Sequence, residues 1–284
     1  MKKILFFSLV SLVILFSGCS KEPDVVILTT SSDLLNADPL TASVGLTITS
    51  NSTWIVKSPV SWCMLSDSIG SGNKSIVLVC DNNLTGKTRE TTISIQAGDK
   101  SKSVVVKQYG GLVLQEENFN DNGMSWIAGK DSLLESINNG FFDIKNNFKI
   151  SAYFVGTRTM ITNYTGNYNI MMDYNSISGT GPFGVTFGFK DNQNFYRLLI
   201  YPQGFYSVTN RVNNVNINNL SGNSIVIKSE NAISLVKIGK NCDLYINGFK
   251  IGTFDISTPY GSMVGFYSCP QTEVYVDYIK VVQY

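Results

Sequence analysis

The fold class is decided by the stretch from Thr91 to Val106, TTISIQAGDKSKSVVV. Apolar Ile93 and Ile95 alternate with polar neighbours, and the alternation continues to Val104 and Val106 after a Gly-Asp-Lys turn. A period of two places alternate side chains on opposite faces of a β-strand. The stretch therefore predicts a hairpin with one buried face.

The composition of the whole chain indicates strands rather than helices. Of the 284 residues, 43% are hydrophobic, 12% are aromatic and only 15% are charged, with 14 Tyr, 16 Phe and 24 Gly. Aromatic and β-branched residues favour strands, and glycines favour the turns between them. We therefore expect an all-β protein with enough apolar side chains for one or two cores.

Two β domains are expected, with a boundary at Gly110-Gly111. Residues 25–110 contain short strand-like runs that predict an immunoglobulin-like β-sandwich. Residues 111–284 are richer in Asn, Tyr and Phe and contain about a dozen further strand-like runs, one of them at 224–228. That number of strands suits a two-sheet jelly-roll sandwich.

Two features of the second domain predict local register. Asn247-Gly248 is typical of a two-residue hairpin turn, which pairs Ile246 with Phe249 and Leu244 with Ile251 on one inward face. In the last strand the apolar alternation changes phase after Val276. A bulge near Asp277 would restore the inward face.

The first residues predict export and lipidation. A basic start and an apolar run precede Phe16-Ser17-Gly18-Cys19, which resembles a bacterial lipobox. We expect a signal peptide at 1–18, an acylated Cys19 and a polar tether over 19–24 that resembles the export signal of Bacteroidetes lipoproteins. An uncleaved anchor is the alternative. The expected location is the outer membrane, on the cell surface or the periplasmic face.

The charge balance and the absence of histidine exclude several functions. Lys plus Arg is 22 and Asp plus Glu is 21, so no basic excess is present to bind nucleic acid. With no histidine, the serine-histidine triads, cysteine-histidine dyads and histidine-ligated metal sites are excluded. The remaining routes to catalysis are carboxylate chemistry, an activated Lys or Tyr, or an oxygen-ligated metal.

The first domain resembles a BACON domain. The resemblance rests on residues that occur in the order of that family: Trp54, Ser61-Trp62, Gly70-Ser71-Gly72-Asn73, Asn83, Thr85, Arg89 and Gln108. It implies a β-sandwich at the N-terminus of an extracellular glycan-handling protein. Trp54 and Trp62 could be sugar platforms, but a small domain needs them in its core. We interpret the domain as a spacer.

The second domain resembles the concanavalin A-like, laminin-G-like lectin and glucanase sandwiches. The residues that carry the resemblance are Phe183–Phe189, Asn194–Arg197, the Asn247-Gly248 hairpin, Val264–Tyr267 and Val276-Asp277. The resemblance implies a carbohydrate-binding or carbohydrate-cleaving fold. Glucanases of this fold carry Glu-x-Asp-x-x-Glu on one strand, and that spacing is absent here. We therefore assign no catalytic residue and expect a non-catalytic protein, or else a glycoside hydrolase.

The candidate ligand-binding residues are aromatic side chains in loop-like sequence. Trp126, Tyr164, Tyr168 and Tyr260 could stack on a sugar ring. No cofactor or metal is assigned, although a structural Ca²⁺ held by oxygen atoms of Glu117, Asn118 and Asp277 is an alternative.

Apart from Cys19, the chain has four cysteines. They form two pairs along the sequence, Cys63 with Cys80 in the first domain and Cys242 with Cys269 in the second. They could form one disulfide in each domain or remain buried thiols.

The expected function combines these features. A membrane-anchored lipoprotein with a BACON-like spacer and a lectin-like sandwich would bind a polysaccharide or glycan without cleaving it. A carboxylate-dependent glycoside hydrolase is the first alternative. A protein-binding adhesin or structural surface component is the second.

Overall fold

The structure is a computed structural model that describes residues 25–40, 42–121, 126, 133–149, 152–160, 166–223, 225–256 and 260–284. The predicted signal peptide, Cys19 with its tether, and Tyr164 lie outside the described residues. Strands β1 to β23 make up the secondary structure, so the all-β prediction is confirmed. Within the described ranges, no helix has the length and hydropathy needed to cross a membrane.

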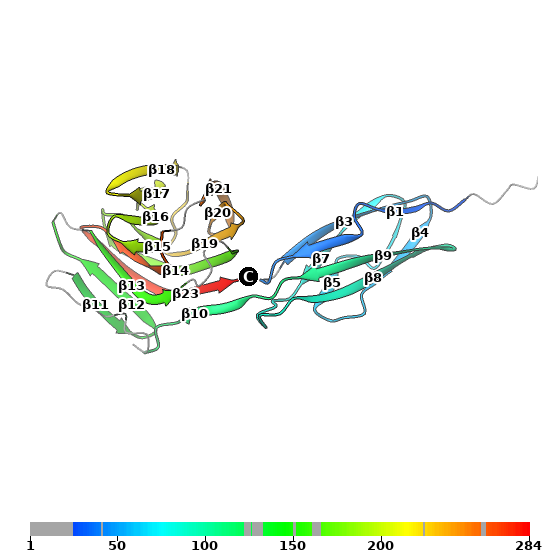
Figure 1. The fold of residues 1–284 in the computed structure, drawn as a ribbon, viewed down its shortest axis with the longest axis horizontal. Helices are drawn as coiled ribbons and strands as arrows, with labels where there is room; N and C mark the ends of the chain where they lie inside the picture. Colours follow the sequence, from blue (N-terminus) through cyan, green and yellow to red (C-terminus); the bar gives the residue numbers. More distant parts are fainter. Residues whose placement is uncertain are drawn as a thin grey trace, which may run out of the picture.

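The N-terminal body consists of two sheets (Figure 1). One has the order β1-β3-β7-β5, formed by β1 (Leu28–Thr30), β3 (Ala42–Ser50), β7 (Lys74–Cys80) and β5 (Cys63–Leu65). The other has the order β2-β9-β8-β4-β6, formed by β2 (Leu34–Ala37), β9 (Lys100–Gln108), β8 (Arg89–Ala97), β4 (Thr53–Lys57) and β6 (Ile69–Ser71). Both sheets contribute side chains to one core.

The hairpin predicted from 91–106 is confirmed. Ile93 pairs with Val104 across β8 and β9, and both side chains are fully buried. Strands β2, β5 and β6 were not predicted from the sequence. They are only three or four residues long, which is too short to show an alternation of apolar and polar residues.

The C-terminal body also consists of two sheets around a single core. The eight-stranded sheet runs β11-β12-β23-β14-β19-β20-β21, with β10 also paired to β23. Its strands are β10 (Leu112–Glu117), β11 (Leu133–Asn138), β12 (Phe141–Asn146), β14 (Tyr168–Gly179), β19 (Glu230–Ile238), β20 (Asn241–Ile246), β21 (Phe249–Asp255) and β23 (Thr272–Gln283).

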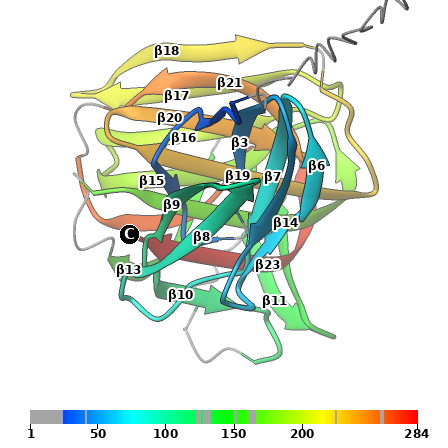
Figure 2. The same ribbon diagram turned by 90° about the vertical axis from the view of Figure 1, so that its right-hand side faces the viewer.

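The six-stranded sheet runs β13-β22-β15-β16-β17-β18. Its strands are β13 (Tyr153–Met160), β22 (Met263–Ser268), β15 (Phe183–Asp191), β16 (Asn194–Ile200), β17 (Tyr206–Val212) and β18 (Val215–Gly222). Figure 2 views the molecule from the side of the N-terminal body, with the strands of both sheets of the C-terminal body behind it.

The bulge predicted near Asp277 is confirmed. Asp173 of β14 pairs with Tyr278, whereas Tyr174 pairs with Val276, so Asp277 has no partner in the ladder. The extra residue lets Val276 and Ile279 both point into the core.

The register predicted for the Asn247-Gly248 hairpin is wrong beyond Tyr245, which still pairs with Lys250. Ile246 does pair with Phe249, but Leu244 pairs with Gly252 because the register shifts by one residue. Phe249 is 72% exposed instead of facing inward. The expected set of four inward side chains assumed a regular ladder, which a bulge breaks.

The strand predicted at 224–228 is also wrong. Residues 225–228 form no strand, and β18 lies earlier in the chain. Side-chain amides bond this segment instead: Asn247 donates to the Val226 carbonyl, and Asn231 bonds both the amide and the carbonyl of Lys228. These bonds replace the strand partners that an apolar run would otherwise need.

The Gly110-Gly111 junction is a place of close backbone approach. A Cβ atom at Gly110 would lie 2.2 Å from the Lys87 backbone nitrogen. The Gly111 amide donates to the Asn83 carbonyl at 2.8 Å, and the Gly86 amide donates to the Gly111 carbonyl at 3.1 Å. The glycines are therefore required by packing at this position.

Candidate binding site

The structure places two of the predicted sugar-stacking residues in the core, which corrects the expectation for them. Trp126 is 1% exposed and stacks on Phe266 with ring centroids 4.9 Å apart. Tyr168 is 2% exposed, and the Lys237 amine lies 5.4 Å from its ring centroid. Neither ring presents a face to solvent, because apolar rings in these positions fill the space between the sheets.

Tyr260 is only partly buried, and its surroundings hold it in place. Its ring stacks on Tyr196 at 5.2 Å, and its hydroxyl accepts a hydrogen bond from the Asn210 amide at 2.7 Å. These contacts fix the ring at the edge of the core. No other predicted stacking residue lies beside it among the described side chains.

The BACON-like residues serve the structure of their own domain. Trp54 is fully buried, and its indole Nε1 donates to the Gly72 carbonyl at 2.9 Å. The Arg89 guanidinium lies 4.3 Å from the Trp62 ring centroid and donates to Gln108 Oε1 at 2.8 Å. These contacts support the interpretation of both tryptophans as packing residues rather than sugar platforms.

The four described cysteines are free thiols. Cys242 points inward from the eight-stranded sheet and is fully buried. Cys269 follows β22 of the six-stranded sheet. Burial raises the pKa of its thiol to about 11, and the positive charge of Arg197 partly opposes this increase. The structure therefore assigns these two thiols to different surroundings, whereas Cys63 and Cys80 are direct cross-strand partners.

A groove on the outer face of the eight-stranded sheet is the best candidate for ligand binding. It consists of two hollows of about 440 and 460 Å³ that share Asp173 and Ala232. The side chains at alternate positions of the same strands, such as Met172 and Ile233, point into the core. We call the two hollows together the outer groove.

The register of four strands builds the apolar half of the outer groove. Tyr278, Asp173 and Ala232 form one row across the sheet. Met171, Ser234 and Tyr245 form the next row.

The two tyrosines lie on β23 and β20, strands that are three strand spacings or about 14 Å apart. Between these strands the floor is formed by Met171 and Asp173 of β14 and by the small side chains of Ala232 and Ser234 of β19. The Tyr278 hydroxyl donates to Glu116 Oε1 at 2.9 Å, which orients its ring.

The polar half of the outer groove carries carboxylates and amides. Asp173, Asp277 and Glu230 line it together with Asn231 and Asn247. The two amide side chains are held by each other and by the backbone: Asn247 Nδ2 lies 3.3 Å from Asn231 Oδ1, and the Ala232 amide donates to Asn247 Oδ1 at 3.0 Å. The rim is therefore preorganised by hydrogen bonds.

Asp173 is the groove acid that both hollows share. Burial, and then the negative charge of Asp277, raise the pKa of the Asp173 carboxyl. Elsewhere on this face acids pair with lysines, as in Lys280 with Glu116 at 3.1 Å. Among the described residues, neither Asp173 nor Asp277 forms such an ion pair. Asp173 is partly buried, whereas Asp277 is exposed. A partly buried carboxylate without an ion pair in a hollow is a common sign of a functional site.

The residues proposed for a structural Ca²⁺ lie at the start and end of the C-terminal body. Glu117 Oε1 accepts the backbone amides of Asn118 and Phe119, at 3.0 and 2.9 Å. Asp277 is exposed at the bulge of β23 and lines the outer groove. Within the described ranges, no group of three or more His, Cys, Asp or Glu could hold a metal ion. The Ca²⁺ site stays a prediction.

The sequence did not single out Tyr245, Tyr278 or Asp173, and it singled out Asp277 only for the bulge and the Ca²⁺ alternative. Tyr245 and Tyr278 occupy polar-phase positions of predicted strands, which indicates outward side chains. That signal alone does not distinguish them from other outward residues. The missing information is which strands are neighbours, and this is a property of the folded sheet.

Comparison with known proteins finds a family model similar to the N-terminal part. The BACON family, described as "Putative binding domain, N-terminal", matches residues 52–109. No curated protein matches the chain.

Several solved structures are similar in architecture. Carbohydrate-binding module CBM66 from Bacillus subtilis is 9% identical, with a TM-score of 0.44, over 60% of this chain and 93% of that chain. A Bacillus subtilis protein of unknown function with a galectin-like fold is 11% identical, with a TM-score of 0.47, over 60% and 96%. A GH43 protein from Bacillus licheniformis is 8% identical, with a TM-score of 0.48, over 72% and 52%.

Proposed function

We propose that the protein binds a glycan in the outer groove without cleaving it. The observation that carries the proposal is the pair of outward tyrosines, Tyr278 and Tyr245, on either side of a hollow whose floor includes the small side chains of Ala232 and Ser234. An aromatic ring can stack on the apolar face of a sugar, and the neighbouring carboxylates and amides can accept or donate hydrogen bonds to its hydroxyls. Such sites bind weakly unless several are engaged together.

The proposal includes the predicted lipid anchor and spacer, which would place the binding site near the outer membrane. A lipid on Cys19 would tether the chain to the outer membrane, and the BACON-like domain would hold the C-terminal sandwich away from the lipid surface. Glycan capture at a cell surface suits this order of parts. The lipidation, the signal peptide and the surface location are part of the proposal.

A glycan array with the mature chain tests the proposal, with quantitative titration of each hit. We expect Tyr278→Ala and Tyr245→Ala each to weaken binding about tenfold, which corresponds to about 1.4 kcal/mol. Tyr278→Phe keeps the ring and should retain most of the affinity, because only the hydroxyl bond to Glu116 is lost.

Tyr267→Ala is the matched control, because this tyrosine lies on the six-stranded sheet next to Arg197. Loss of binding in that variant alone would assign the glycan to the other sheet and contradict the outer groove as the site.

A glycoside hydrolase is the second candidate, favoured by one observation. Asp173 and Asp277 line the same hollow, and the pKa of Asp173 is raised by burial and by Asp277, as an acid catalyst requires. A reducing-sugar release assay on the array hits distinguishes the two. Release of reducing sugar that is lost in both Asp173→Asn and Asp277→Asn would establish the hydrolase. If neither glycan binding nor sugar release is detected, the result would favour a protein-binding surface component.

A further inference from the structure

Two cysteines of the N-terminal body lie directly opposite each other. Cys63 of β5 pairs with Cys80 of β7 in an antiparallel ladder. Both side chains are buried, at 1% and 0% exposure, and both belong to the same core. Their side chains therefore point to the same side of the sheet.

The hydrogen bonds on either side define the kind of pair that they form. The Asp81 amide donates to the Trp62 carbonyl at 2.9 Å, and the Ser66 amide donates to the Val77 carbonyl at 2.8 Å. In an antiparallel ladder, hydrogen-bonded and non-hydrogen-bonded pairs alternate. Cys63 and Cys80 therefore occupy a non-hydrogen-bonded position.

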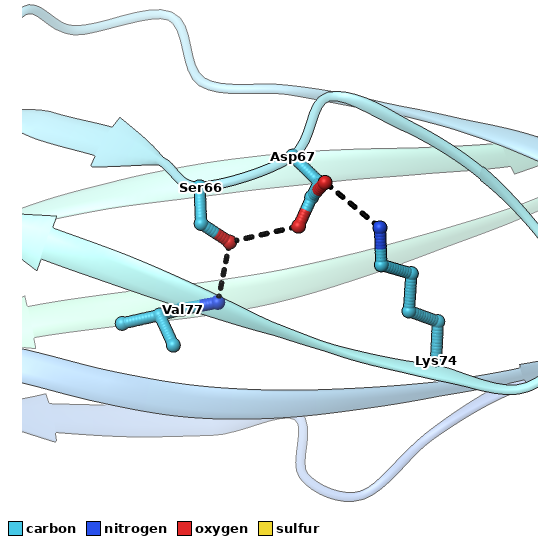
Figure 3. A network of polar contacts seen from close by, with 4 residues as sticks. All are labelled: Ser66, Asp67, Lys74 and Val77. Carbon is cyan, nitrogen blue, oxygen red and sulfur yellow. Dashed lines mark hydrogen bonds and ion pairs between the residues drawn. The ribbon is translucent and has the colours of Figure 1, made fainter.

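Figure 3 shows how the far end of this ladder is held. The Val77 amide donates to the Ser66 hydroxyl at 3.0 Å, and that hydroxyl donates to Asp67, which also pairs with Lys74 at 2.8 Å. The short strand β5 is thus fixed against β7 in one register. A slip that would separate the two cysteines would break these contacts.

The non-hydrogen-bonded position brings two thiols within reach of a covalent bond. Residues in such pairs have Cα atoms about 4.5 Å apart, within the range of about 4.4 to 6.8 Å that disulfides span. We infer that Cys63 and Cys80 form a disulfide when the chain folds in an oxidising compartment, and that the thiols in the structure represent the reduced form.

The chemistry is thiol–disulfide exchange with an external disulfide as oxidant. One cysteine thiolate attacks that disulfide and forms a mixed disulfide, and the second cysteine then displaces the oxidant's remaining sulfur. One S–S bond forms between Cys63 and Cys80, and the two cysteines lose two protons and two electrons. The oxidant gains them and leaves as two thiols.

The bond should form before the core closes. Burial and the neighbouring Cys80 raise the pKa of the Cys63 thiol to about 12, so little thiolate exists in the folded domain. The Trp62 ring and the Arg89 guanidinium pack together beside Cys63. The folded dithiol should therefore react slowly with oxidants, and the folded disulfide should resist reduction.

Peptide mapping of the full chain, exported and purified without reductant, tests the inference. After alkylation in denaturant, trypsin should release residues 58–74 joined to residues 75–87, and reduction should separate them. Alkylated Cys63 and Cys80 in the unreduced sample, or a link from either one to Cys242 or Cys269, would overturn it.

Thermal unfolding supplies an independent measurement. Reduction in denaturant followed by refolding should lower the unfolding temperature of the N-terminal domain by roughly 10 °C. Cys63→Ala should abolish this sensitivity to reductant, whereas the matched control Cys242→Ala should keep both the sensitivity and the linked peptide. If reduction and refolding left the unfolding temperature of the wild-type protein unchanged, the result would contradict the disulfide.

Discussion

At the scale of single residues, Asp173 is a carboxylate whose charge costs stability. Its pKa is raised above 3.8 by burial and by Asp277, so the folded chain binds more protons than the unfolded chain just above that pH. Stability therefore falls as the pH rises through the folded pKa. We expect Asp173→Asn to stabilise the C-terminal body at pH 7 by up to about 1 kcal/mol, with the gain vanishing below about pH 4.

Asp191 is the matched control because its shift has the opposite sign. Hydrogen bonds from the Gln193 backbone amide and the Asn194 side chain lower the pKa of Asp191. Its contribution to stability is present above the unfolded pKa and is lost as the pH falls through the folded value. Asp191→Asn should therefore destabilise at pH 7. The measurement is the unfolding temperature of each variant by calorimetry from pH 3 to 8. If both substitutions changed the stability at pH 7 in the same direction, the result would contradict this assignment.

At the scale of elements, the packing of β4 on β6 depends on one glycine. A Cβ atom at Gly70 would lie 2.2 Å from the Trp54 ring, and the indole cannot move away without losing its bond to the Gly72 carbonyl. We expect Gly70→Ala to destabilise the N-terminal domain by about 1 to 3 kcal/mol. The measurement is the denaturant midpoint of that domain.

Gly45 of β3 provides the control within the same domain. A Cβ atom there would meet nothing within 4 Å. Gly45→Ala should leave the midpoint unchanged or raise it slightly. Equal losses in both variants would mean that the Trp54 contact is not the cause.

At the scale of the whole molecule, one buried amide holds the junction between the two bodies. Asn83 is 1% exposed, and its side chain donates to the carbonyls of Lys87, Gln108 and Tyr109, where the chain leaves β9 for β10 (Figure 1). Asn83→Ala removes these donors and should loosen the junction. We expect limited trypsin digestion to cut the variant faster at Lys87 or Lys107 and to leave the C-terminal body intact.

Asn51→Ala is the control for that experiment. Its amide also bonds backbone groups, those of Val25 and Ile27, but at the opposite end of the N-terminal body. Cleavage near the junction should not change in this variant. Equal acceleration in both variants would indicate general destabilisation of the domain and not a loosened junction.

The sequence by itself determined the all-β class and several local features. The alternation around Ile93 and Val104 and the phase change near Asp277 both appear in the structure as predicted. These features depend on neighbours along the chain or across one turn. Local alternation is sufficient to specify them because each strand must bury one face.

Only the tertiary structure decided which aromatic side chains can meet a ligand and which cysteines are partners. Trp126 and Tyr168 are buried between the two sheets, whereas Tyr245 and Tyr278 face outward across the groove. Strand order, bulges and the stacking of one sheet on the other determine these positions. They bring together residues far apart in the chain, and such long-range pairing leaves little trace in local alternation.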